Sequence, residues 1–116
     1  MTANDWKLAK DEVTDILIER AKVKGMISYS ELVSMIKSMH FEAYDTRLFN
    51  LLGEVSADEN AKGRGMLSVV VVHKHGDMQP GPGFFGLAER LGRDVNDKLI
   101  CWINELEKVH AYWSVK

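Results

Sequence analysis

Apolar side chains recur at every third or fourth position through residues 5–24, with charged side chains between them. This spacing predicts an amphipathic helix that stops at Gly25. Ser28 and Glu31 then have the spacing of a capping box, which predicts a second helix over residues 29–40.

A third helix is predicted to follow Asp45, because aspartate is a common N-terminal cap of helices. Its apolar side chains share one face, and the segment loses this pattern before Gly63. The opposite face carries Arg47 and Asn50. The apolar face consists of Leu48, Leu51, Leu52 and Val55.

The chain then changes from a helical to an extended pattern. Residues 66–73 include four consecutive valines and predict a strand that is apolar, and therefore buried, on both faces. Residues 26–29 and a short piece after His75 are the expected pairing partners. The run Pro80-Gly81-Pro82-Gly83 predicts a rigid turn. We favour a structural turn over a phosphate-binding loop, because no Walker lysine follows it and no GxGxxG motif is present.

Two more helices are predicted, a short one over residues 84–91 and a long one over residues 94–113. In the long one, apolar residues are alternately three and four positions apart, which is the spacing of a heptad seam. This seam can pack on the first helix within one molecule, or part of it can face another chain. The part predicted to form the interface of a homodimer consists of Trp102, Leu106, Val109 and Trp113.

Composition places the chain among soluble globular domains. It has 116 residues, of which 46% are hydrophobic, and this length suffices for one core. The net charge of −2 gives no global basic field for nucleic acid. The single cysteine, Cys101, excludes an internal disulfide and is expected to be a buried, unreactive thiol. We recognise no secretory leader and no membrane span, so we expect a cytoplasmic protein.

The order of capped helix, second helix, strand and turn-rich arm resembles a winged helix-turn-helix. The segment Ile27-Ser28-Tyr29-Ser30-Glu31-Leu32 looks like the opening of many such domains. The stretches LLGEVS, GRGMLSVVVVHK and PGPGFF also resemble a small family of uncharacterised bacterial proteins. These resemblances imply an α+β fold in one domain over residues 1–116, with a winged-helix-like core and long N- and C-terminal helices.

Binding to double-stranded DNA is the function that a winged helix implies. In that fold a recognition helix enters the major groove, where Arg47 can pair with guanine and Asn50 with adenine. Lys62, Arg64 and Lys74 can bind phosphate groups.

Charge is divided unevenly between these segments. Residues 61–93 carry five basic and two acidic side chains, whereas residues 26–60 carry two basic and six acidic ones. The predicted wing is therefore basic, but the predicted reading helix lies in an acidic region that repels DNA.

His73 and His75 are the second candidate site. Residues two positions apart on a strand share a face, so both imidazoles can reach one metal ion. Asp77 or Glu54 would supply a third ligand. The alternative is that His73 simply ends a core strand, since no second ligand pair has a diagnostic spacing.

Three functions remain open from the sequence. The first is a non-enzymatic, dimer-prone DNA-binding or regulatory protein that needs no cofactor. The second is a protein-interaction module in which the acidic helices and the basic arm recognise a partner. The third is a metal-dependent enzyme around His73 and His75. We expect no enzyme, because no serine or cysteine nucleophile lies in a recognisable catalytic motif.

Overall fold

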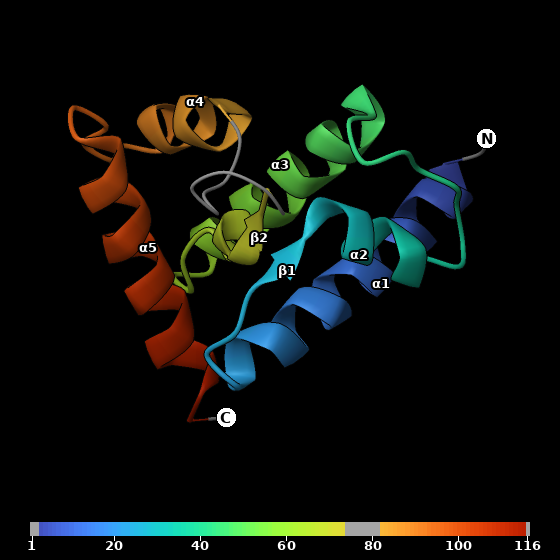
Figure 1. Ribbon diagram of the computed structural model, residues 1–116, viewed down its shortest axis with the longest axis horizontal. Coiled ribbons are helices and arrows are strands. Elements are labelled where there is room, and N and C mark those ends of the chain that lie inside the picture. Colours follow the sequence, from blue (N-terminus) through green and yellow to red (C-terminus); the bar gives the residue numbers. More distant parts are fainter. Residues whose placement is uncertain (1–2, 74–81, 116) are drawn as a thin grey trace.

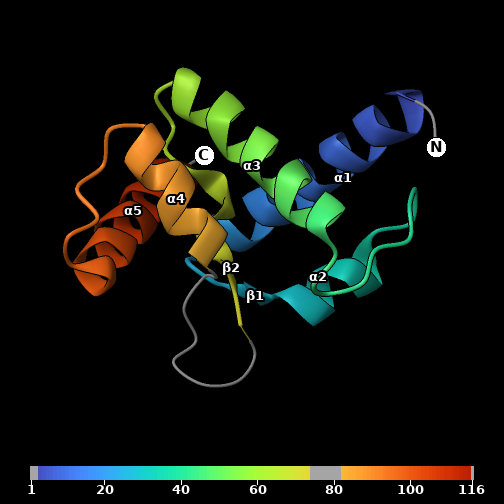
Figure 2. The same cartoon turned by 90° about the horizontal axis from the view of Figure 1, so that it is seen from above.

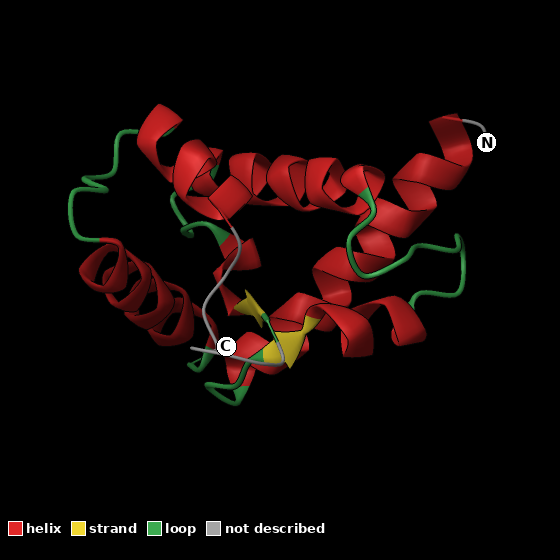
Figure 3. Cartoon of the chain, turned by 45° about the horizontal axis from the view of Figure 1, so that its top comes forward, coloured by secondary structure: helices red, strands yellow, loops and turns green. Residues whose placement is uncertain are grey.

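Helices make up most of the fold (Figure 1 and Figure 3). The computed structural model describes residues 3–73 and 82–115. Its strands, β1 (Ile27–Ser28) and β2 (Val71–Val72), form a two-stranded parallel sheet. Its helices are α1 (Ala3–Lys22), α2 (Tyr29–Met35), α3 (Thr46–Ala61), the 3₁₀ helix η1 (Leu67–Val70), α4 (Pro82–Arg90) and α5 (Lys98–Trp113).

The predicted winged-helix fold, and with it the α+β class, is wrong. The wing of that fold is a β-hairpin, whose strands are antiparallel. In the described residues the two strands are parallel and two residues long each. The expected partner at residues 26–29 is confirmed as β1, whereas the one expected after His75 lies outside the described residues. The chain is therefore a mostly helical protein with a minimal sheet.

The valine-rich segment is buried as predicted, but only its last part is a strand. β1 offers two residues for pairing, because α2 begins immediately after Ser28. Before β2, the Ser68 amide donates to Ser56 Oγ on α3 at 2.9 Å. The Val69 amide donates to Met66 O at 3.0 Å, which is a 3₁₀-type bond. These contacts outweigh the strand propensity of the valines.

η1 forms the centre of the core. It packs against α1, α3 and α5, and all of its residues are buried. Figure 2 shows α4 beside α3, against which it packs, and α5 at one end of the molecule. The C-terminal part of α5 meets the end of α1, where His110 Nε2 lies 2.9 Å from Gly25 O. None of the described helices is both long enough and apolar enough to cross a membrane.

The predicted helix caps are confirmed. Ser28 Oγ accepts from the Glu31 amide at 3.1 Å, and the Asp45 carboxylate accepts from the Arg47 amide at 2.9 Å. The Glu31 carboxylate forms an ion pair with Arg20 of α1 instead of completing a capping box. This ion pair joins the start of α2 to the end of α1.

Two helix boundaries differ from the prediction by more than two residues, and each difference has a physical reason. α5 begins at Lys98, because the side chain of Asp97 caps it by accepting from the Ile100 amide at 3.1 Å. α2 ends at Met35, because Glu12 of α1 binds the backbone that follows. The Glu12 carboxylate accepts from the amides of Lys37 and Ser38 at 3.0–3.1 Å and from Ser38 Oγ at 2.8 Å.

Glu12→Ala is expected to lower the free energy of unfolding by about 1–2 kcal/mol at neutral pH, because two amides lose a charged acceptor. Burial acts to raise the pKa of Glu12, but the hydrogen bonds from Lys37 and Ser38 hold it below its usual value. Its contribution is therefore present at neutral pH and is lost as the pH falls through that lowered pKa. Urea unfolding at neutral pH and at about pH 3 measures both effects.

Asp15→Ala is the matched control, because Asp15 is an exposed acidic residue of the same helix. The two variants should differ at neutral pH and converge in acid. An equal loss at both pH values would contradict the role assigned to the Glu12 carboxylate.

Candidate ligand-binding cavity

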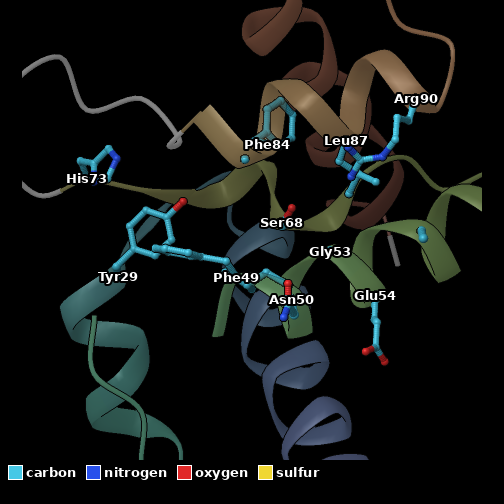
Figure 4. A pocket seen from close by; sticks show the side chains of 13 residues that line it. Tyr29, Phe49, Asn50, Gly53, Glu54, Ser68, His73, Phe84, Leu87 and Arg90 are labelled. Atoms are coloured by element: carbon cyan, nitrogen blue, oxygen red, sulfur yellow. The ribbon is translucent and has the colours of Figure 1, made fainter. Parts of the chain in front are cut away.

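A cavity of about 750 Å³ lies between α3 and α4, next to the start of α2 and the end of β2 (Figure 4). Its volume falls in the range of about 300–1,000 Å³ that is typical of small-molecule sites. Gly53 and Ala57 of α3 line it without filling it, and Leu87 of α4 supplies an apolar wall opposite. Small side chains on one helix thus leave space that a larger residue would occupy.

Aromatic rings form one end of the cavity. The Tyr29 and Phe49 rings meet nearly edge to face, with their centroids 5.8 Å apart. Tyr29 also contacts His73, and the centroids of these two rings lie 5.1 Å apart. Phe84 lines the cavity from α4 and packs edge to face on Phe85 at 5.3 Å. The N-terminal cap at Ser28 fixes the start of α2 and so helps to position Tyr29.

Ser68 places a hydroxyl group in the wall of the cavity. The residue is 8% exposed, and Ser56 Oγ donates to Ser68 Oγ at 2.5 Å. Ser56 Oγ in turn accepts from the Ser68 amide at 2.9 Å. Ser56 Oγ therefore both donates and accepts a hydrogen bond, and Ser68 Oγ accepts one. The hydroxyl proton of Ser68 has no acceptor among the described residues. Figure 4 shows the Ser68 oxygen directed to the side of the cavity on which Phe84 and Leu87 lie.

The two charged residues of the lining differ in their hydrogen-bond and ion-pair partners. Glu54 accepts from Trp6 Nε1 at 3.1 Å and lies 3.5 Å from Lys10 Nζ, and its carboxylate points away from Leu87 (Figure 4). Arg90 makes no ion pair or hydrogen bond with any residue that the structure describes. The guanidinium of Arg90 is thus the available charge at this cavity.

The residues predicted to contact DNA lie at both ends of α3 and beyond it. Asn50 lines the cavity. The guanidinium of Arg47 is held by the carboxylate of Asp45 at 2.7 Å, and this contact raises the pKa of Arg47 and lowers that of Asp45. Arg64 forms an ion pair with Glu59.

Arg64 also lies over the ring of Trp113, 5.3 Å from its centroid. Lys62 is exposed at the end of α3, and Lys74 lies outside the described residues. The two arginines therefore already have carboxylate partners with which DNA would compete. DNA binding stays a prediction.

The candidate metal ligands are not brought together in the part of the chain that is described. His73 is exposed and lies against Tyr29, while His75 and Asp77 lie outside the described residues. No three His, Cys, Asp or Glu side chains cluster as a metal site within residues 3–73 and 82–115.

The heptad seam of α5 packs within the molecule. Val109 is fully buried, and Trp102 Nε1 donates to Val69 O at 3.3 Å. Leu106 and Trp113 are partly buried against the same core. These four residues therefore pack on the core of their own molecule, as the intramolecular alternative predicts. A homodimer stays a prediction. Cys101 is buried as expected, and burial raises the pKa of its thiol.

Most residues of the cavity were not identified as functional from the sequence. Phe49 carried the clearest signal, since a large aromatic side chain on the polar face of a helix is unusual, and it is 42% exposed here. Ser68 and Arg90 carried no signal, because their roles depend on neighbours remote in the chain. No protein-family model, curated protein or solved structure matches this chain.

Proposed function

We propose that the protein binds a small organic molecule in the cavity between α3 and α4. The observation that carries this proposal is one space of about 750 Å³ that combines aromatic walls with uncommitted hydrogen-bond donors. The cavity is partly open to solvent, so a ligand can enter it without a rearrangement of the core. Mostly apolar walls with a few oriented polar groups are what small-molecule sites share.

Binding alone, without catalysis, fits the chemistry of the lining best. Ser68 is the hydroxyl that a nucleophilic mechanism would use. A serine nucleophile needs a general base within hydrogen-bonding reach. Its side-chain partner here is Ser56, which is not a base, and no described imidazole or carboxylate forms a hydrogen bond with either hydroxyl. The protein is thus a ligand-binding module, in which occupancy of the cavity is the functional event.

Ala57→Leu is expected to block the cavity and to weaken ligand binding at least about tenfold, because the added side chain occupies space that the ligand needs. Ala111→Leu makes the same change on an exposed position of α5 and serves as the matched control. The probes are anilinonaphthalene sulfonate, followed by fluorescence, and a panel of planar aromatic fragments, followed by amide chemical shifts.

Saturable binding that Ala57→Leu weakens and Ala111→Leu leaves unchanged would support the proposal. Shift changes should concentrate at Phe49, Gly53 and Leu87. If no probe shifts these amides, or if both variants bind equally well, the cavity is not a binding site. Urea unfolding of both variants ensures that only folded protein is compared.

A further inference from the structure

We infer that the ligand is a planar aromatic anion, whose negative group is bound by Arg90 and which presents a hydrogen-bond acceptor to Ser68. This inference rests on the proposed binding function and specifies the chemical class of the ligand.

The arrangement of the charges around the cavity, and not their sum, favours an anion beside Arg90. Glu54 and Asp58 share one cation, Lys10, whose Nζ lies 3.5 Å from the Glu54 carboxylate and 2.6 Å from that of Asp58. The local acidic groups on α3 are therefore already engaged by a cation from α1. Arg90, on the opposite wall, has no carboxylate partner in the described residues. A ligand that brings a carboxylate supplies the bidentate partner that a guanidinium binds best.

The uncommitted proton of Ser68 selects for an acceptor. The Ser56 hydroxyl donates to Ser68 Oγ and accepts from the Ser68 amide. Ser68 is therefore oriented by α3 and left with a single free donor in an apolar wall. A ligand without an acceptor at this position would leave that donor desolvated and unpaired, which costs binding free energy.

The aromatic end of the cavity favours a flat ring system. Phe49 is 42% exposed although it contacts Tyr29 edge to face, so part of its ring remains open to the cavity side. Phe84 lines the opposite wall from α4. Offset or edge-to-face contacts with such rings add to the apolar burial of an aromatic ligand. Flat shape, acceptor and negative charge are thus selected by three separate parts of the wall.

The test compares 6-hydroxy-2-naphthoate with its uncharged isostere 6-hydroxy-2-naphthamide, called naphthoate and naphthamide below, in which the ring hydroxyl oxygen is the acceptor for Ser68. Both carry the same rings and both present an acceptor oxygen, so they differ mainly in charge. Isothermal titration with the full chain should give an affinity about tenfold higher for naphthoate, as expected for a charge-assisted hydrogen bond. Arg90→Gln should abolish this preference and leave naphthamide affinity nearly unchanged. Lys108→Gln, which removes an exposed cation of α5 away from the lining, should preserve the preference.

Ser68→Ala should lower the affinity for both ligands by a similar factor, because both lose the same hydrogen-bond donor.

The remaining outcomes separate the two proposals. If both ligands bind equally and Ala57→Leu weakens both, the cavity is a binding site and the inferred negative charge is wrong. If naphthoate is preferred equally by the wild type and Arg90→Gln, Arg90 is not the anion site. If neither ligand binds, or Ala57→Leu changes neither, the proposed function itself fails.

Discussion

Glu105→Ala is expected to lower the free energy of unfolding by about 3–5 kcal/mol, as breaking a buried ion pair typically does. The Glu105 side chain is 5% exposed and accepts from Arg93 Nε and Nη2, each at 3.0 Å. Its Oε2 also accepts from the Met66 amide at 2.7 Å. Removing the carboxylate leaves a mostly buried guanidinium and a buried amide without their acceptor. Urea unfolding measures the loss.

Glu107→Ala is the matched control, because Glu107 is an exposed residue of the same helix. Its expected effect stays within about 0.5 kcal/mol, as for most surface substitutions. Glu105→Gln should fall between the two, since it keeps an acceptor for Met66 and loses the charge. A loss below about 1 kcal/mol for Glu105→Ala would show that the ion pair does not hold α5 in place.

Gly65→Ala is expected to destabilise the fold by about 2–4 kcal/mol through two additive causes. Gly65 has a φ of +89°, which is unfavourable for residues with a side chain. A Cβ at this position would also lie 2.9 Å from Val109 Cγ2 and 3.1 Å from Glu105 Oε2. The backbone therefore approaches α5 more closely than any other residue type allows.

Gly63→Ala separates these two causes. Gly63 has a φ of +77°, but an added Cβ would meet nothing within 4 Å. It should cost only the conformational part, about 1–2 kcal/mol. Equal losses in the two variants, measured by urea unfolding, would exclude the close approach as a cause.

Local signals predicted the helices well, and remote partners explain the errors. Ser28 and Asp45 cap helices because their short polar side chains reach nearby amides, which is a property of adjacent residues. The end of α2 was misplaced because Glu12, two elements earlier, binds the backbone at Lys37. The strand over residues 66–73 was overestimated because its length depends on how many residues β1 offers.

The cavity could not be predicted from the sequence for the same reason. The sequence places Asn50 on the polar face of α3, where a contact with DNA is predicted, but it gives no sign that this residue also lines the cavity. The sequence alone does not show that the carboxylates of Asp45 and Glu59 pair with Arg47 and Arg64. Periodicity shows which face of a helix is apolar, but the volume left between two helices depends on how they pack.

The hydrogen bond between Met66 and Glu105 also bears on how the chain is made. It joins residues 39 positions apart, and η1 needs α5 as well as α1 and α3 around it. During synthesis the N-terminal helices leave the ribosome first, and closing so long a loop carries an entropic cost. The apolar surface of η1 therefore stays partly uncovered until α5 has emerged. The nascent chain completes its fold late, at the moment when α5 docks.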